Sequence, residues 1–401
     1  MDTFICIFLV FISCFSSVAS RPHLPTHNVR VHADADGLCS AAVEPHNYPC
    51  HEHKVTTNDG YILSLQNIPY GISGKTEGER QPVLLQHGVL MDAATWLISP
   101  PDQSLALVLA DEGFDVWLVS TRGTDYSRGH TSLSPDDAVY WDWSWDELVA
   151  YDLPATFEYV HAQTGQKLHY VGHSQGTLMA LAAVSSGDLV SMMRSAALLS
   201  PIAYLGEVTS PLARIGAETL LGETLHWLHI NEFNPRGKAV IELLKYMCKE
   251  KGADCTDLLT SFTGENCCLN SSIVSVFLQH EPQPTSTKNM IHLSQMIRGG
   301  KICKYDYEDE EENKKHYGTP APPSYEMSRI PSDLPLLLAY GGADALSVAR
   351  DVELLLDSLD GHARDKLVVD YREDYAHADY VMAVNARQVV YDPLIAFFRL
   401  Q

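Results

Sequence analysis

The sequence predicts an open, mostly parallel α/β sheet of eight strands, with helices on both faces and a long, mainly helical insertion. Short apolar runs bounded by glycine, proline or polar residues alternate with helical patterns, as in sheets built from βαβ units. The alternation stops near residue 200 and resumes near residue 333, a gap too long to lack structure of its own. The length of 401 residues suits one large domain with such an insertion.

The first half of the chain supplies six of the expected strands. Two alternating runs, HEHKVTT and YILSLQNI, flank Asn58-Asp59-Gly60 and predict a β-hairpin. A helix from Ser144 towards Gln163 is expected to begin with a capping box formed with Glu147 and to kink at Pro154. The remaining strands are expected at Pro82–Gln86, Phe114–Ser120, Leu168–Val171 and Ala196–Ser200, and further helices at Ser104–Glu112 and from the turn at Ser174 to Ser186.

The alternation resumes in the last seventy residues. Strands are expected at Leu334–Tyr340 and Leu367–Tyr371, with helices at Ala349–Leu359 and Ala386–Arg399. The insertion between the two halves holds amphipathic patches and an acidic run, residues 306–312, which we interpret as a solvated surface loop. Three tryptophans, Trp141, Trp143 and Trp145, are interpreted as core packing rather than as a membrane-facing patch.

The amino terminus resembles a secretory signal. An apolar run, Phe4–Phe15, precedes small residues at Val18 and Ser20, which predicts cleavage before Arg21. The run is shorter than the ~20 residues that span a bilayer, and an uncleaved anchor is the alternative. The expected organisation is a signal peptide (1–20), a loosely held arm (21–49), a core (50–200), the insertion (201–332) and the rest of the core (333–401).

The charge and the cysteines restrict the partners and the compartment. The formal net charge of -23 disfavours binding to nucleic acid. Seven of nine cysteines remain after loss of the signal, an odd number that predicts at least one free thiol in an oxidising compartment. Cys39 and Cys50 could form a disulfide, whereas the pairing of the others stays open, and their spacing argues against zinc (Cys248, Cys255, Cys267, Cys268 and Cys303). Asn270 begins a glycosylation sequon.

The candidate reactive group is Ser174, in the turn Gly172-His173-Ser174-Gln175-Gly176. A predicted strand precedes this G-x-S-x-G turn and a predicted helix follows it. Such a turn exposes the serine Oγ, and glycines on both sides allow the backbones to pack closely. The order of strand, turn and helix favours a nucleophile over a serine in an ordinary turn.

A serine hydroxyl needs a base, and the base needs an orienting carboxylate. Asp344 and His377 each follow a predicted strand, so they should lie at the same sheet edge as Ser174. Other candidates fit less well, because they lie before a strand, within a helix or beside His377 (Asp333, Asp351, His362, Asp374 and Asp379). Of these, Asp379 is expected to hold the loop of His377.

Attack on a carbonyl creates an oxyanion, which two backbone N–H groups can stabilise. We expect these donors to be Gln175, after the nucleophile, and Val89, with Leu90 as its neighbour, after the strand ending at Gln86. His87 and His173 are expected to support their turns. The sequence has no phosphate-binding glycine loop and no metal-spaced ligand set, so no cofactor and no metal are expected.

At these residues the chain resembles the acid lipases of the α/β-hydrolase superfamily, the family of gastric and lysosomal lipases and their plant counterparts. The matching segments span most of the chain: NDGYILSLQNIPYG, LLQHGVL, DVWLVSTRG, YDLPAT, TGQKLHYVGHSQGT, GGAD and YAHADY. Residues 306–312 depart from the family pattern, and the Cys267-Cys268 pair and the pair of Cys39 and Cys50 depart from the mammalian pattern.

The resemblance implies an α/β-hydrolase fold in which Ser174, Asp344 and His377 are catalytic and Val89 and Gln175 form the oxyanion hole. It also implies that the insertion is a cap, part of it a movable lid over an acyl pocket.

The implied enzyme is a secreted or vacuolar/lysosomal serine lipase that hydrolyses lipid esters at an oil–water or membrane interface. Triacylglycerols are the expected substrates, and no protein partner is implied. The alternatives are a soluble-ester carboxylesterase, a sterol-ester hydrolase or an acyltransferase on the same scaffold. A further alternative is a catalytically silent binding scaffold, against which the complete triad argues.

Overall fold

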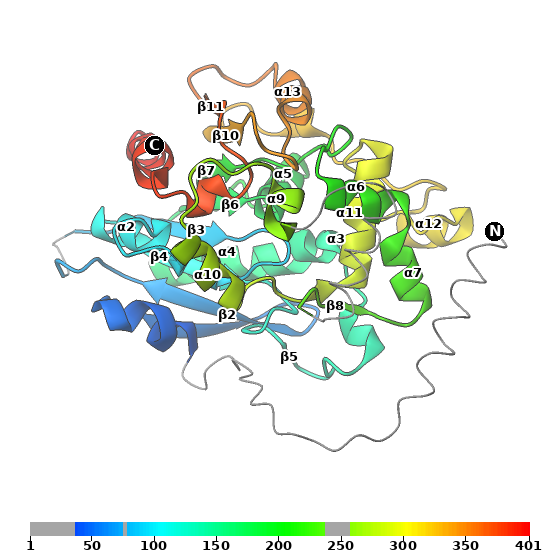
Figure 1. Cartoon of the computed structure of the whole chain (residues 1–401), viewed down its shortest axis with the longest axis horizontal. Coiled ribbons are helices and arrows are strands. Elements are labelled where there is room, and N and C mark those ends of the chain that lie inside the picture. Colours follow the sequence, from blue (N-terminus) through cyan, green and yellow to red (C-terminus); the bar gives the residue numbers. More distant parts are fainter. Residues whose placement is uncertain (1–36, 75–77, 237–256) are drawn as a thin grey trace. The chain divides into compact units, whose positions relative to one another are not determined.

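The computed structural model describes residues 37–74, 78–236 and 257–401. Within these ranges a nine-stranded sheet has the order β1-β2-β4-β3-β6-β7-β10-β11, with β5 (Gly129–His130) paired to β2 (Figure 1). The other strands are β1 (His51–Thr56), β2 (Tyr61–Ile68), β3 (Pro82–Gln86), β4 (Asp115–Ser120), β6 (Leu168–His173), β7 (Met193–Leu199), β10 (Leu336–Gly341) and β11 (Leu367–Arg372).

The strand pairing is mostly parallel, as predicted. β2 runs antiparallel to β1, β4 and β5, and every other pair in this sheet is parallel. The eight predicted strands are all present, with ends shifted by up to three residues. The two-residue β5 was not predicted, since so short a pairing leaves no periodic pattern in the sequence.

Both faces of the sheet are covered, because alternate strand residues enter two separate cores. Leu337 and Ala339 of β10 join the core under α2 (Leu105–Asp111) and α15 (Asp392–Arg399). Leu336 and Leu338 join the core under α4 (Leu153–Thr164), α5 (Gln175–Ser185) and α13 (Ala349–Ser358). This alternation is the period of two expected for a strand buried on both sides.

The helix predicted from Ser144 is present but is not continuous. Ser144 and Glu147 form the expected capping box at the start of α3 (Trp145–Glu147). Residues 148–152 then make a wider π-type turn, and Pro154 lies in the first turn of α4. Because proline lacks an N–H and excludes the carbonyl four residues earlier, the helix has to widen before it. The three tryptophans of this region are buried in the core, which confirms their interpretation as packing residues.

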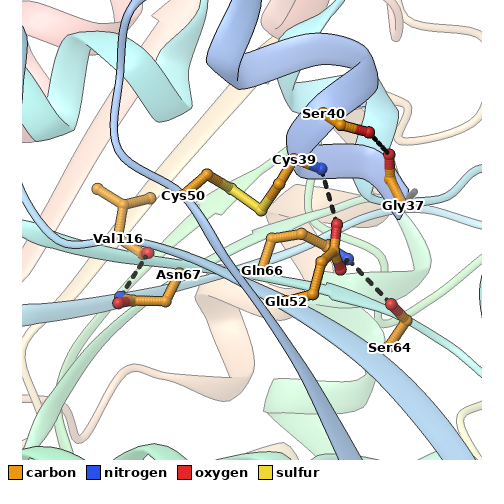
Figure 2. Close-up of a disulfide and its surroundings, with 9 residues drawn as sticks. All are labelled: Gly37, Cys39, Ser40, Cys50, Glu52, Ser64, Gln66, Asn67 and Val116. Atoms are coloured by element: carbon orange, nitrogen blue, oxygen red, sulfur yellow. Dashed lines mark hydrogen bonds between the residues drawn. A yellow bond between two sulfur atoms is a disulfide. The ribbon is translucent and has the colours of Figure 1, made fainter.

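The segment before β1 is packed rather than loosely held, which corrects the expectation for the described part of residues 21–49. A disulfide joins Cys39 to Cys50, and the Cys39 N–H donates to Glu52 Oε1 over 2.7 Å (Figure 2). Leu38 and Val43 are fully buried in the core beneath α2. The expected signal peptide lies outside the described residues.

The insertion is mainly helical. Helices α6 (Pro211–Glu218) and α7 (Leu221–Trp227) pack against α11 (Thr287–Gly299), as Figure 1 shows. The other described elements are β8 (Glu232–Phe233), α9 (Leu258–Thr263), α10 (Ser271–His280), β9 (Thr285–Ser286), α12 (Glu310–Tyr317) and a short 3₁₀ turn, Met327–Arg329. The amphipathic patch at residues 239–247, with Cys248 and Cys255, lies outside the described residues.

The acidic run is only in part the predicted loop. Asp309 caps α12 by accepting hydrogen bonds from Glu311 and Glu312, and Glu310 to Glu312 occupy the first turn. Carboxylates at a helix N-terminus interact favourably with its dipole, and the helix ends in Lys314, Lys315 and His316. Residues 308–312 of the run are exposed, as expected, whereas Asp306 and Tyr307 are half-buried, and the run is helical from Glu310.

The described helices include none with the length and apolar character needed to cross a membrane. Among the described cysteines, Cys267 and Cys268 form a disulfide and Cys303 is a free thiol.

Candidate active site

Ser174 lies between the end of β6 and the start of α5, where the backbone is strained. Its φ of 54° and ψ of -121° are rarely adopted by a residue with a side chain. The flanking glycines are required by space. A Cβ on Gly176 would lie 2.5 Å from the Gln86 carbonyl oxygen, and one on Gly172 would lie 2.8 Å from the Gly176 carbonyl carbon. The turn therefore has the form that the sequence pattern predicts.

Asp344 and His377, 33 positions apart in the chain, lie side by side beyond the ends of β10 and β11. The His377 Nδ1 lies 2.9 Å from Asp344 Oδ2 and 3.1 Å from Oδ1. Since a carboxylate only accepts hydrogen bonds, Nδ1 carries the proton and Nε2 is left with its lone pair. Both side chains are buried.

The Asp344 carboxylate is stabilised in its charged form. Burial alone would raise the pKa of this carboxyl, but His377 and the hydrogen bond from the Leu346 N–H together hold the pKa below its usual value. Its Oδ1 also accepts hydrogen bonds from the backbone N–H groups of Leu346 and Ser347, each over 2.8 Å. The carboxylate is thus charged and fixed in orientation beside the imidazole.

The turn of Ser174 lies against the His377 loop. The His173 Nε2 donates to the His377 carbonyl oxygen over 3.0 Å, and the two rings are 4.8 Å apart. The Nε2 of His377 is buried and, within the described residues, has no hydrogen-bond partner. Catalytic hydrogen bonds are often longer in the absence of substrate. The His377 imidazole therefore lies beside the serine turn, although no hydrogen bond joins its Nε2 to the Ser174 Oγ.

The loop after β3 closely approaches the serine. A Cβ on Gly88 would lie 2.9 Å from the Ser174 Cβ, so only glycine fits there. The His87 Nε2 accepts from the Thr121 N–H over 3.0 Å, and its Nδ1 donates to the Gly88 carbonyl oxygen over 2.8 Å. Burial lowers the pKa of His87 to about 4. A neutral His87 thus braces the loop that carries Val89.

The competing acidic and histidine residues have other contacts. Asp351 accepts hydrogen bonds from the Glu207 N–H, and His362 binds the Leu334 carbonyl oxygen. Burial, with a smaller effect from the His377 charge, lowers the pKa of His173 to about 3. It is therefore neutral and acts as a support, as expected.

Asp379 holds the loop of His377, and the sequence did not predict its partners. Its carboxylate accepts from the N–H groups of Ala376, Cys267 and Cys268 over 2.8, 3.0 and 3.2 Å. The Thr263 carbonyl oxygen accepts from the His377 and Ala345 N–H groups. Residues 263–268 of the insertion therefore contact the loops of both Asp344 and His377.

A second contact links the insertion to the serine turn. The Gln175 side chain donates to Asn289 Oδ1 of α11 over 3.0 Å, and both residues are buried. The sequence did not predict this hydrogen bond, because the two residues lie 114 positions apart in the chain.

One group of side chains in the described ranges has potential metal ligands close together: Cys267, Cys268 and Asp374. The two sulfurs are joined in a disulfide. They are not available as the thiolates that soft metals bind.

Fold and site together define the class of α/β-hydrolase enzymes. The family described as "alpha/beta hydrolase fold" matches residues 81–219, and that described as "Partial alpha/beta-hydrolase lipase region" matches residues 39–100. Among solved structures, the fold resembles a soluble variant of monoglyceride lipase from Saccharomyces cerevisiae. The TM-score is 0.56 at 13% identity, covering 88% of this chain and 94% of that one.

Within this class, the chain belongs to the family of triacylglycerol lipases. It is 50% identical to Triacylglycerol lipase 2 of Arabidopsis thaliana over 370 residues, 92% of this chain and 88% of the relative. It is 35% identical to the human gastric triacylglycerol lipase over 361 residues, 87% of each chain.

Proposed function

We propose that the chain is a serine lipase in which Ser174, His377 and Asp344 are the catalytic triad. As a member of this family it hydrolyses carboxylic esters of lipids. The observation that carries the triad is the buried His377–Asp344 pair, whose open Nε2 lies beside the strained turn of Ser174.

In the proposed mechanism, His377 Nε2 takes the proton of Ser174 as its Oγ attacks the ester carbonyl carbon. The tetrahedral intermediate collapses to an acyl-enzyme, and the alcohol leaves with the proton from His377. Water then attacks the acyl-enzyme, with His377 again accepting and returning a proton. Asp344 fixes the tautomer of the imidazole and stabilises its charged form.

The oxyanion would be bound by the N–H groups of Val89 and Gln175. Two features support this proposal: Gln175 begins α5 directly after Ser174, and the close approach of Gly88 brings the loop of Val89 to the Ser174 side chain. Donors held by a rigid backbone need little rearrangement as negative charge develops on the substrate oxygen.

We further propose that residues 201–332 form a cap and that the substrates are triacylglycerols at a lipid–water interface. The relatives support this choice, since both carry the name triacylglycerol lipase. Trp227 at the end of α7 is 75% exposed, and Leu228 and Ile230 beside it are also exposed, which favours contact with lipid. The test is the rate of ester hydrolysis measured as the substrate concentration passes its solubility limit. If this rate does not increase sharply above the limit, a soluble-ester hydrolase is favoured instead.

The proposal includes entry into the secretory pathway, with residues 1–20 as the signal, and an extracellular or vacuolar/lysosomal destination. Asn270 supports the expected glycosylation, because it is exposed at the start of α10. Mass spectrometry of the purified native protein would test both the new amino terminus and the glycan.

The decisive experiment compares Ser174→Ala with Ser132→Ala, a matched change at an exposed serine. We expect Ser174→Ala to abolish hydrolysis of emulsified triacylglycerol and labelling by a fluorophosphonate, and Ser132→Ala to retain both. Retained hydrolysis in Ser174→Ala, or labelling at another residue, would refute the proposal.

A further inference from the structure

Two buried carboxyl groups face each other where the insertion meets the loop after β3. Asp92 lies four residues beyond Gly88, and Glu281 follows the end of α10. Their exposed fractions are 0% and 1%. The groups are close enough to form a side-chain hydrogen bond with each other, although they are 189 positions apart in the chain.

One oxygen of each carboxyl has backbone or hydroxyl donors. Glu281 Oε1 accepts from the Asp92 N–H over 3.0 Å and from the Thr95 hydroxyl over 2.9 Å. Asp92 Oδ1 accepts from the Ala94 N–H over 2.7 Å. The other oxygens, Asp92 Oδ2 and Glu281 Oε2, are buried, and no donor from the described residues reaches them.

Neither carboxyl has an ion-pair partner among the described residues. Asp125 and Arg236 are charged residues that act on Asp92; they are 3.8 Å from each other and each about one-third exposed. Arg236 favours ionisation of the pair and Asp125 opposes it. Burial lowers the pKa of the adjacent His280, as does the charge of Arg236. Two such carboxyls cannot both ionise at low energetic cost, and a proton held by one carboxyl can be donated to the other.

The pair is directly connected to the proposed oxyanion loop. Two residues after Glu281, the Gln283 N–H donates to the Leu90 carbonyl oxygen over 2.8 Å. Gln283 is buried, and its Oε1 accepts from the Asp125 N–H over 3.0 Å. Residues 281–283 therefore bind the backbone of Leu90 and Asp92, on both sides of Met91, and Leu90 directly follows Val89.

We propose that Glu281 is a positioning residue for the oxyanion loop, which it holds in place through a proton shared with Asp92. The inference rests on the function proposed above, since it takes Val89 as an oxyanion donor. With one proton shared, the insertion and the loop are held together. When the pair loses its last proton, two buried negative charges repel each other, and the loop moves away from Ser174.

The direction of the pH effect follows from burial. Burial raises the pKa of the Asp92 carboxyl to about 7, and burial together with the Asp92 charge raises the pKa of Glu281 above its usual range. Both groups hold protons in the folded protein that they would release when unfolded. The contact is therefore complete in acid. The pair loses its first proton as the pH rises through about 7, and the contact is lost above that pH, when the second proton leaves.

The test is the pH dependence of kcat for Glu281→Gln on a dissolved short-chain ester, measured by chromatography of the released acid. The amide keeps the acceptor for Asp92 and Thr95 and supplies a permanent donor to Asp92. We expect kcat of the unmodified protein to fall about tenfold or more between pH 6 and 8.5. This loss is smaller than the fall in kcat of about 10²–10³-fold that removal of an oxyanion donor causes. Glu281→Gln should lose less than about threefold. Glu310→Gln, at an exposed position of α12, is the matched control.

Identical profiles for Glu281→Gln and the unmodified protein would overturn the inference. If Glu281→Gln does not fold, Asp92→Asn places the amide at the other member of the pair. Its kcat must then show the same weak dependence on pH. If neither variant folds, the rate at which a fluorophosphonate labels Ser174 in the unmodified protein is measured instead. A labelling rate that keeps rising from pH 6 to 8.5 would overturn the inference. Loss of the triad proposal would appear separately, as absence of Ser174 labelling at pH 5.

Discussion

At the scale of single residues, Asp344 shows how one side chain can set the chemistry of another. Its Oδ1 is held by two backbone N–H groups, and its Oδ2 is left to receive the Nδ1 proton of His377. The backbone contacts fix the carboxylate before any substrate binds. The imidazole is then held in the one tautomer that leaves Nε2 able to accept a proton.

Asp344→Asn should therefore reduce kcat far more than it alters the fold. The amide oxygen can still accept from Leu346 and Ser347, but the amide nitrogen would face Nδ1 and favour the opposite tautomer. We expect kcat to fall by about 10⁴-fold. The measurement is hydrolysis of a dissolved ester together with the rate of fluorophosphonate labelling.

Asp351→Asn is the control for this change, because Asp351 is another buried carboxylate and, among the described residues, is seen to accept from the Glu207 N–H. It should retain the activity of the unmodified protein. A kcat for Asp344→Asn within tenfold of that value would exclude Asp344 as the orienting carboxylate.

At the scale of elements, residues 263–268 connect the insertion to the loops that carry Asp344 and His377. The Thr263 carbonyl oxygen, the Asn266 side chain and the Asp379 carboxylate all take part. Most of these bonds use backbone N–H groups, so they fix the path of the chain rather than one side chain. The position of the proposed base therefore depends on an element outside the sheet.

Asp379→Asn should weaken this connection. An amide has one acceptor oxygen, whereas the carboxylate receives three N–H groups on its two oxygens. Leaving a buried N–H without a partner costs about 1–3 kcal/mol. We expect a loss of that size in the free energy of unfolding, measured in urea, and a lower kcat. Asp374→Asn, an exposed change in the same loop, should leave both values unchanged. Equal unfolding curves for the two variants would show that Asp379 does not support the loop.

At the scale of the whole molecule, local sequence patterns predicted the helices and strands. They did not predict contacts between residues that are far apart in the chain. The strand before Ser174 and the helix after it follow from apolar periodicity and glycine placement, which are local. Asp92 and Glu281 are separated by 189 positions, and neither is unusual in its own segment. From the acidic run the sequence predicted a charged surface, but it did not predict the helix capped by Asp309. Many like charges in a row indicate repulsion between side chains more strongly than helix formation.

The stability of the whole molecule should also depend on pH through His169. This residue lies in β6 beneath the C-terminal helix. Its ring nitrogens bond to Ser195 Oγ and Gln81 Oε1, each over 2.8 Å, and its ring stacks on Phe398 with centroids 4.3 Å apart. Burial, with a smaller effect from the Arg194 charge, lowers the pKa of His169 to about 3. The folded protein therefore holds a neutral imidazole at a pH where the unfolded chain binds a proton.

Unfolding consequently takes up a proton at His169 below its ordinary pKa of 6.5, so stability falls as the pH decreases from there towards about 3. One such proton changes the free energy of unfolding by about 1.4 kcal/mol per pH unit. In urea unfolding, His169→Gln should be less stable at pH 7.5 but should lose about 1–3 kcal/mol less than the unmodified protein between pH 6.5 and 4.5. His51→Gln, on the exposed edge strand, should keep the original slope. If the slopes of the unmodified protein and His169→Gln are equal, protonation of His169 does not contribute to acid unfolding.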